Sequence, residues 1–529
     1  MTDGKTVNVI GAGLAGLSAA ITLARAGISC NLISSLYSER AQSVLAEGGI
    51  NAVLNTMGED DTIAEHFTDT MRGGCFLEAE SAVRNLTQNA PDVVRELVRL
   101  GVPFQSSEGR LILRNFGGQL KKRTAYAKSS TGKMIMTALI DEVRKYESCG
   151  LVMRYPHHEM IGITTEDSRL VSVTVRDSYT GKTFSFYGCT VLCTGGLHGF
   201  FEGVTTGTTQ NTGHAAAIAF RAGVEFANLE FIQYHPTTVQ ISDKRMLISE
   251  AARGEGGRLF ILRNGTPWYF MEEKYPTLGN LMPRDVVSRE MVLVKQEAGC
   301  DGEIYLDLTG LDISVWRGKL SDLRDEIMAY LHMDPQNTPI PVGPGIHYFM
   351  GGIRVNDRHE TNIRGLFAAG ESACKYHGAN RLGGNSMLGA IFGGQIAAQA
   401  AGEEGKKMKI EENDVIDIDS SSAHNRDILR DALLDGLGIV RDPESMQRSL
   451  SQVESLCSDR DLNEIDRDRA WLGLAMIRSA LAREESRGAH YRIDFPKTDD
   501  RYKKQTVTKY KDGLVQLQFA APDARWEGG

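Results

Sequence analysis

The sequence predicts an α/β protein whose parallel sheet is assembled from distant parts of the chain. Three short apolar segments each end in a glycine-containing turn, namely Val7–Ile10 before Gly11, Thr190–Gly196 and Gly365–Glu371. Apolar runs bounded by turn residues are typical of buried strands in parallel sheets. Because the segments are far apart in sequence, we expect a domain that is interrupted by an insertion.

The first strand opens the strongest motif of the N-terminal region. Gly11-Ala-Gly13-Leu-Ala-Gly16 follows it directly, and Leu17–Ala26 has the apolar spacing of an amphipathic helix. A strand, a GxGxxG turn and a helix in this order place a pyrophosphate at the helix N-terminus. Gly11, Gly13, Ala15 and Gly16 are therefore candidate dinucleotide-binding residues.

The next predicted strand, Cys30–Ser34, ends at Ser34 where dinucleotide-binding proteins usually have an acidic residue. That acidic residue binds the ribose hydroxyls of a nicotinamide cofactor. Ser34 stays a candidate contact, but its presence disfavours a plain nicotinamide dehydrogenase. The wide spacing of the strands favours a flavin-binding domain, because nicotinamide domains are more compact.

Polar residues are densest among glycines in the segment His377-Gly-Ala-Asn-Arg381-Leu-Gly-Gly-Asn-Ser386, which precedes a Gly/Ala-rich helix. Glycine lets the backbone approach a flat ligand, and the free N–H groups of a helix start bind electron-rich atoms. Arg381 adds a planar guanidinium suited to a carboxylate. A glycine-rich loop without a ligand does not explain this density, so we expect cofactor and anion binding.

Composition and charge favour a large enzyme without a nucleic-acid partner. The 529 residues allow several domains, and 41% apolar with 24% charged residues is ordinary for a globular protein. A net charge of −9 argues against nonspecific nucleic-acid binding, so an anionic substrate needs a local basic site. No apolar run approaches the roughly 18 residues of a membrane span, and no signal peptide is recognisable. We expect a cytoplasmic protein without direct membrane insertion.

The eight cysteines show no metal-binding pattern. There is no CxxC pair, no ferredoxin-like spacing and no haem attachment sequence. We expect buried thiols in a reducing compartment, with no metal site and no iron–sulfur cluster in this chain.

These motifs resemble the flavoprotein subunits of the fumarate reductase and succinate dehydrogenase family, which also includes L-aspartate oxidase. The similarity runs nearly from end to end and includes Gly11–Gly16, Ala46–Asn51, Phe116–Gly118, Phe231–Thr237, Ser249–Gly256, Pro283–Asp285, His347–Gly352, His377–Ser386 and Ser486–Tyr491. The resemblance implies a Rossmann-like FAD-binding domain of the α/β class, an inserted α+β capping domain and a C-terminal helical domain.

The resemblance also implies FAD-binding positions beyond the N-terminal glycines. These positions are Ser34, Ser43, Glu47, Gly48, Gly49, Thr194, Gly195, Glu371, Asn385, Ser386 and Leu388. The respiratory members of the family have a histidine at the position of Gln42 and bond it covalently to the flavin. Gln42 cannot form this bond, so we expect noncovalent FAD, and this favours reduction over succinate oxidation.

The substrate-binding positions that the resemblance implies are His235, His347, Arg381, Ser249 and Phe116. Two imidazoles and a guanidinium can offset the charges of a dicarboxylate and hold it over the flavin ring. In the family, hydride passes from flavin N5 to one alkene carbon and a proton reaches the other carbon.

Arg284 matches the position of the family's proton donor. Because its pKa is above roughly 12, an arginine acid requires the exclusion of water and a relay that replaces the proton. Glu250 and Arg253, spaced i and i+3, match that relay. A structural ion pair between loops is the alternative role for these residues.

Phe116 separates two members of the family. L-aspartate oxidases have a glutamate there, which accepts the substrate ammonium, whereas phenylalanine fits a plain dicarboxylate. The favoured function is therefore reduction of fumarate to succinate, or the reverse reaction. L-aspartate oxidase, a reductase of another enoate or dicarboxylate, and an electron-transfer module without a substrate are the alternatives. His214 stands where most relatives have an aspartate, and we expect it near the flavin.

The expected FAD-binding domain takes residues 1–230 and 345–405, and the capping domain takes 231–344, whose closure expels water. Residues 406–424, rich in Glu and Lys and then in Asp and Ser, are expected to be a linker. Residues 425–529 are expected to form a helical domain and a tail, shorter than the family's usual C-terminal domain. The expected partners are a small dicarboxylate substrate and an iron–sulfur electron-transfer subunit.

Overall fold

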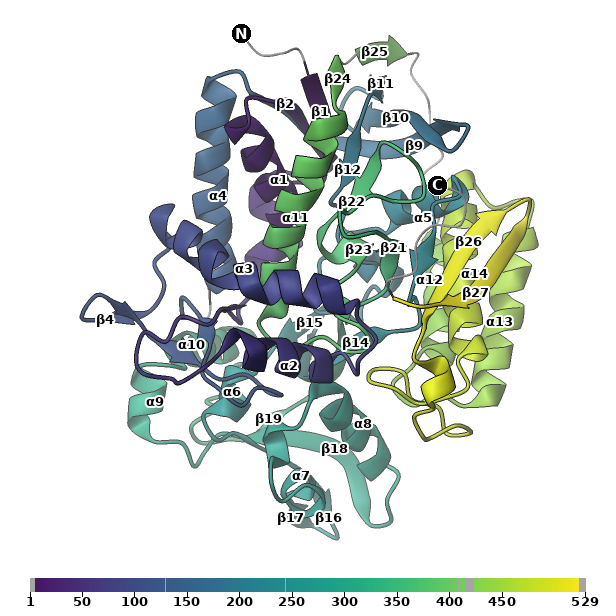
Figure 1. Cartoon of the computed structure of the whole chain (residues 1–529). Helices are drawn as coiled ribbons and strands as arrows, with labels where there is room; N and C mark the ends of the chain where they lie inside the picture. The colour runs from purple at the N-terminus through teal and green to yellow at the C-terminus, as the bar shows by residue number, and fades with distance from the viewer. Residues whose placement is uncertain (1–4, 129, 243, 408–409, 414–422, 523–529) are drawn as a thin grey trace.

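The computed structural model describes residues 5–128, 130–242, 244–407, 410–413 and 423–522. At its centre is a parallel sheet with the strand order β22-β12-β1-β2-β8 (Figure 1). The strands are β1 (Lys5–Ile10), β2 (Ser29–Ser34), β8 (Val152–Pro156), β12 (Thr190–Leu192) and β22 (Leu366–Ala368). In the register of the sheet, Val9 lies between Leu32 of β2 and Val191 of β12. The three strands that end in glycine turns are thus direct neighbours.

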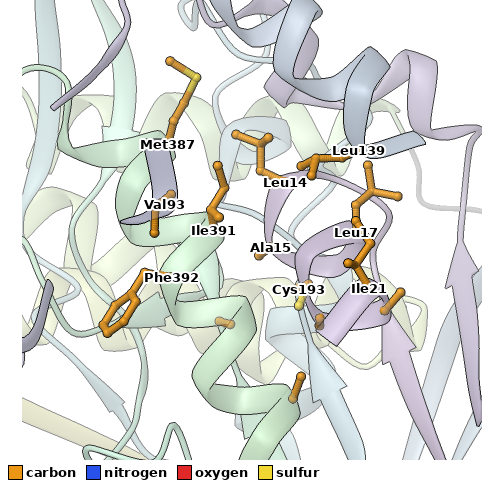
Figure 2. Close-up of a cluster of buried hydrophobic side chains, with 14 of the residues drawn as sticks. Leu14, Ala15, Leu17, Ile21, Val93, Leu139, Cys193, Met387, Ile391 and Phe392 are labelled. Atoms are coloured by element: carbon orange, nitrogen blue, oxygen red, sulfur yellow. The ribbon is translucent and has the colours of Figure 1, made fainter. Parts of the chain in front are cut away.

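Helices cover one face of this sheet. They are α1 (Leu14–Arg25), α4 (Thr131–Ser148) and α11 (Asn385–Glu404), with α2 (Ile63–Gly73) and α3 (Glu80–Arg99) beyond them. Since side chains alternate along a strand, Val7 and Val9 share a core with these helices. Figure 2 shows Leu14 and Ala15 of α1 on the side of Ile391 of α11, and Leu17 of α1 on the side of Leu139 of α4.

The opposite face of the sheet is covered by a second, antiparallel sheet. It has the order β25-β11-β10-β9, with β9 (His158–Glu166), β10 (Arg169–Asp177), β11 (Thr183–Tyr187) and β25 (Ile410–Asn413). Ile10, Ile33 and Leu192 of the parallel sheet share a core with Val173 and Phe186. The parallel sheet is therefore covered on both faces.

The chain between β13 (Phe226–Ala227) and β20 (Gly343–Phe349) forms an insertion with a core of its own, lying below the central sheet in Figure 1. Its strands and helices are β14 (Ile232–Ile241), β15 (Lys244–Leu247), α6 (Ala251–Gly254), β16 (Arg258–Arg263), β17 (Thr266–Trp268), α7 (Phe270–Lys274), α8 (Arg284–Val294), β18 (Cys300–Asp307), α9 (Ile313–Arg317), α10 (Ser321–Leu331) and β19 (Ile340–Pro341). β14 and β20 pair antiparallel, so the chain leaves and rejoins the rest of the protein side by side.

The C-terminal region contains α12 (Ala423–Gly436), α13 (Pro443–Ser458), α14 (Glu464–Ala482), β26 (Gln505–Lys511) and β27 (Leu514–Ala520). Leu433, Val453 and Met476 belong to the same core as Phe220 of α5 (His214–Arg221) and Phe226. β26 pairs with β13 in a sheet of order β23-β21-β13-β26-β27. The C-terminal helices therefore share a core with the antiparallel sheet and α5, and they have no separate core among the described residues.

The expected linker at 406–424 is wrong for its first part. β24 (Lys406–Lys407) pairs with Lys5 and Thr6 of β1, at the end of that strand which β12 does not reach. β25 completes the edge of the antiparallel sheet beside β11. β24 pairs with backbone groups of β1 that β12 leaves unpaired, and β25 does the same for β11 at the edge of its sheet. Residues 408–409 and 414–422 lie outside the described residues.

Candidate active site

A cavity of about 890 Å³ opens at the carboxyl ends of the parallel strands and extends to the insertion. Ligands of open α/β sheets bind at this edge. Most of the predicted residues line the cavity. Those on the cofactor side are Gly11, Gly13, Ala15, Ser34, Ser43, Glu47, Gly48, Gly49, Thr194, Gly195, Glu371 and Ser386. Those on the substrate side are Phe116, His235, Ser249, Glu250, Arg284, His347 and Arg381.

The cradle around α1 fits a pyrophosphate. The backbone of Gly11 has a φ of 108°, and a Cβ there would overlap the carbonyl oxygen of Cys193. α1 begins at Leu14, and its N-cap residue is Gly13, which has no side chain that could cap the helix. Ser43 Oγ accepts a hydrogen bond from the Leu14 amide at 3.2 Å. A helix N-terminus surrounded by glycine backbone is a suitable site for the phosphates of a dinucleotide.

Three predicted cofactor residues lie behind the cavity wall instead of lining it. A Cβ on Gly16 would overlap the carbonyl oxygen of Gly11, so this glycine allows α1 to pack on its own turn. The Asn385 amide bonds with Asn51 at 2.8 Å and with Thr70 at 3.0 Å in a buried polar cluster. Leu388, a residue of α11, is fully buried in the core between the helices and the central sheet. All three support the wall from behind.

Glu371 lies in the cavity wall with its carboxylate held in place. Its Oε1 accepts a hydrogen bond from the Phe349 amide at 3.0 Å and lies 3.3 Å from His198 Nε2. The other ring nitrogen of His198 contacts Thr205 Oγ1 at 2.8 Å. Sequence reasoning missed His198, because nothing local marks a buried histidine as the neighbour of a distant carboxylate.

His235 and His347 lie face to edge on adjacent strands of the insertion sheet. Their ring centroids are 5.2 Å apart, and His347 Nδ1 contacts Thr206 Oγ1 at 2.8 Å. Burial lowers the pKa of each imidazole well below its ordinary value, and the charge of Arg284 lowers it further. Both rings are therefore neutral at neutral pH in the free site. In the free site the positive charge therefore comes from the arginines.

Arg381 lies on the ring of Tyr348, with its guanidinium carbon 4.5 Å from the ring centroid. Burial lowers the pKa of Arg381 to about 9, with a further contribution from Arg284, so the side chain stays charged at neutral pH. Its Nε is buried without a hydrogen-bond partner. A buried N–H donor of this kind can donate to an anionic ligand without first losing another hydrogen bond.

Arg284, Glu250 and Arg253 form a continuous buried chain. Arg284 donates to Glu250 Oε2 from Nη2 at 2.6 Å and from Nε at 3.0 Å. Arg253 Nη2 donates to Glu250 Oε1 at 3.3 Å, and its Nη1 donates to the Asn280 carbonyl at 2.6 Å. Burial raises the pKa of Glu250, but the two arginines outweigh it and hold the pKa below its ordinary value. Arg253 itself does not line the cavity, so the chain leads from the cavity wall into the insertion.

Sequence reasoning also missed Gln233 and Asn380. Gln233 contacts both Arg284 and Arg381, and Asn380 contacts Gln233. One signal was available for Gln233, because residues two apart on a strand face the same side and His235 is two residues later. For Asn380, the polar density of the 377–386 segment was the available signal.

The residues that discriminate among relatives also lie at the cavity. Gln42 lines it, and its Oε1 accepts a hydrogen bond from the Thr208 amide. The buried ring of Phe116 lies against Gly48. His214, the first residue of α5, does not itself line the cavity, although its neighbours Gly213 and Ala215 do. Its Nδ1 lies 3.6 Å from Oε1 of Glu159, which lines the cavity, so its expected place near the flavin stays a prediction.

Two kinds of feature are absent from the described residues. They contain no helix that is both long and apolar enough to cross a membrane. They also contain no group of three or more His, Cys, Asp or Glu side chains that could hold a metal ion.

The chain is similar to known proteins along almost its whole length. Residues 6–387 match the FAD binding domain family, and residues 467–525 match the fumarate reductase flavoprotein C-terminal family. The succinate dehydrogenase flavoprotein subunit of Bacillus subtilis is 37% identical, over 98% of this chain and 96% of its own length. The fumarate reductase flavoprotein subunit of Mycobacterium tuberculosis is 31% identical, over 100% and 99%. A mutant FrdA from E. coli quinol fumarate reductase has a similar structure, with a TM-score of 0.87, 28% identity and coverage of 98% of this chain and 97% of that chain.

The fold and the site thus define an FAD-dependent oxidoreductase of the class that acts on CH–CH bonds. The chain belongs to the fumarate reductase and succinate dehydrogenase flavoprotein family, and FAD is its cofactor.

Proposed function

We propose that this chain is the FAD-bearing subunit of a fumarate reductase, which reduces fumarate to succinate and also supports the reverse reaction. The observation that carries the proposal is the buried chain from Arg284 through Glu250 to Arg253, which starts in the cavity wall near Arg381. A structural ion pair would need no opening to a ligand cavity. The proximity of this chain to a second buried arginine suits an anionic substrate that is to be protonated.

Arg381 and the two imidazoles bind the substrate carboxylates in this proposal. Thr206 Oγ1 lies 2.8 Å from His347 Nδ1. In this proposal the hydroxyl donates to that nitrogen, so the neutral ring has its proton on Nε2, which then donates to one carboxylate. His235 Nδ1 lies 3.2 Å from the Thr237 carbonyl oxygen, so a neutral ring donates there and leaves Nε2 without a proton. Dicarboxylate binding therefore favours uptake of a proton by His235, which turns its Nε2 into a second donor.

Arg284 then gives a proton to one alkene carbon, and Glu250 and Arg253 replace that proton from the insertion side. When reduced FAD is bound in the cavity beside these residues, it would supply the hydride for the other alkene carbon. All three relay residues are buried even without a ligand, at most 8% exposed, so competing protonation by bulk water is suppressed. This exclusion is what lets a guanidinium act as an acid.

The flavin is held without a covalent bond in this proposal, because the amide of Gln42 occupies the position of the histidine that forms the link in respiratory members. The names of the relatives, flavoprotein subunits, support a complex. We assign the electron-donating role to an iron–sulfur subunit at the cytoplasmic side. Any attachment to a membrane then belongs to partner subunits.

An anaerobic assay with reduced viologen tests the activity directly. The FAD-loaded chain is expected to oxidise viologen when fumarate is added and to leave L-aspartate unchanged, because Phe116 offers no partner for a substrate ammonium. Rapid oxidation of aspartate without turnover of fumarate would refute the proposal. Acid precipitation is expected to release all flavin into the supernatant, and flavin retained by the pellet would contradict the role given to Gln42.

A further inference from the structure

Two buried cations meet in this site from separate parts of the chain. Arg284 is the first residue of α8 in the insertion, and Arg381 lies in the loop before α11. Each lowers the free energy of a bound dicarboxylate, but their like charges repel. Glu250 is hydrogen-bonded to Arg284 and Arg253, not to Arg381. Something other than that carboxylate must set the distance between the two cavity-facing guanidiniums.

Gln233 contacts both guanidiniums through one atom. Its Oε1 accepts hydrogen bonds from Arg284 Nη1 at 3.2 Å and from Arg381 Nη2 at 3.0 Å. An amide oxygen has two lone pairs and no net charge. It can therefore hold two cations together without cancelling the positive charge that the substrate requires, which a carboxylate would do.

The orientation of the Gln233 amide is fixed by its other contacts. Its Nε2 donates to Asn380 Oδ1 at 2.7 Å and to the Arg381 carbonyl at 2.9 Å. A flipped amide would place its NH₂ group against two guanidinium donors and its oxygen against two acceptors. Gln233 is completely buried and does not line the cavity, so it acts from behind the arginines.

Asn380 extends this contact to the insertion. With Oδ1 bound to Gln233, its Nδ2 donates to Asp285 Oδ1 at 2.8 Å. Asp285 directly follows Arg284 in the first turn of α8. The 377–386 loop thus reaches the α8 start twice, once through the side chain of Arg381 by way of Gln233 and once through Asn380.

We propose that Gln233 and Asn380 are positioning residues that hold Arg284 and Arg381 in register, so that substrate binding and proton delivery are assembled together when the insertion contacts the loop. The amide pair touches neither substrate nor flavin and acts only through the two arginines. This inference rests on the proposed function, in which Arg381 binds the substrate and Arg284 donates the proton. Its tests therefore measure the reduction of fumarate.

Two substitutions of Gln233 separate the effect of its shared acceptor oxygen from the effect of its lack of net charge. Gln233→Met keeps the volume and removes the shared acceptor, so kcat for fumarate is expected to fall about 100-fold, the size of a 1 Å misplacement of a catalytic group. Gln233→Glu keeps two acceptor oxygens but adds a negative charge, so KM is expected to rise at least about 10-fold with a smaller loss of kcat. Gln88→Met, on the exposed face of α3, is the matched control. Values of kcat and KM within twofold of the parent for both variants, or the same kcat and KM pattern for both, would overturn the proposal.

A reciprocal exchange tests the Asn380 contact. Asn380→Asp alone places two carboxylates together, and a loss of about 100-fold in kcat is expected. Asp285→Asn combined with Asn380→Asp restores one donor and one acceptor, and it is expected to recover kcat to within about fivefold of the parent. Asn89→Asp on α3 controls for the charge change. A folded, FAD-loaded double variant that is no better than the single variant would overturn the proposal, since a loss of packing alone is not repaired by reversing the pair.

Malonate binding distinguishes a failure of this inference from a failure of the proposed function. Binding of malonate, followed by the change in flavin absorbance, reports on the register of the arginines without turnover. A parent protein that binds malonate but does not reduce fumarate refutes the proposed function only. Weakened malonate binding in Gln233→Met but not in Gln88→Met then still supports the positioning role, and equal binding in the two variants refutes it.

Discussion

Glu250→Gln changes one atom of a buried side chain that accepts three hydrogen bonds from two arginines. An amide at this position must turn its NH₂ group towards Arg284 or Arg253, and it can no longer carry a proton between them. Loss of a positioned acid–base group lowers a rate by about 10²- to 10⁴-fold, so we expect kcat to fall about 1,000-fold. Leaving buried guanidiniums without their counter-charge costs about 3–5 kcal/mol of unfolding free energy.

Substrate affinity is expected to change in the other direction. Glu250 lies beside the positive groups that bind the dicarboxylate, and removal of its charge leaves more net attraction, so the Kd of malonate is expected to fall a few-fold. The assay is anaerobic viologen oxidation with fumarate, alongside a malonate titration of the flavin absorbance and urea unfolding. Glu273→Gln, an exposed carboxylate of the same insertion, is the control. A folded, FAD-loaded Glu250→Gln protein that keeps kcat within threefold of the parent would refute the relay.

Three further outcomes are expected. Gly11→Ala forces a side chain into the Cys193 carbonyl at a left-handed φ, so the purified protein should contain little FAD by absorbance, while Gly27→Ala, where a Cβ meets nothing, should retain it. Because the pKa of His235 is well below 6.5 in the free site and binding favours its protonated form, malonate affinity should fall as pH rises. Its Kd should increase by up to about tenfold per pH unit between pH 6 and 8, and a flat profile would contradict this linkage. Phe116→Glu should weaken fumarate binding at least about 10-fold and allow slow aspartate oxidation, and an unchanged KM for fumarate would show that Phe116 does not face the substrate.

The backbone of the site could be predicted from sequence because local patterns specify it. A strand, a GxGxxG turn and a helix define the cradle around Gly11 without knowledge of the rest of the fold. The strand ends at Thr194 and Glu371 could be placed in the same cavity, since parallel strands end at one edge of their sheet. The motifs and the resemblance also predict Gly16 and Leu388 as cofactor residues, but the structure places both behind the cavity wall. A motif does not distinguish residues that line a cavity from residues that support its wall.

Long-range polar contacts could not be predicted in the same way. Gln233 binds Arg284 and Arg381, which are 51 and 148 residues away in sequence. The neutral state of the two histidines depends on burial by several segments, and no local pattern reports that burial. β24 pairs with Lys5 and Thr6 of β1 because β12 pairs only with Asn8–Ile10. This free segment of β1 exists only once the sheet has formed, so no local pattern predicts the pairing.

The attachment of the insertion through two paired strands has a consequence for how such enzymes can diversify. His235 and His347 stand on the outgoing and returning strands, whereas Glu250, Arg253 and Arg284 lie in the chain between them. A different polypeptide could be spliced between Ile241 and Gly343 while the flavin site, both imidazoles and Arg381 stay in place. Such a graft would keep the two imidazoles and Arg381 but would lose Ser249, Arg284 and the proton relay. The paired strands β14 and β20 thus carry one part of the substrate site, and the chain between them carries the other part together with the relay.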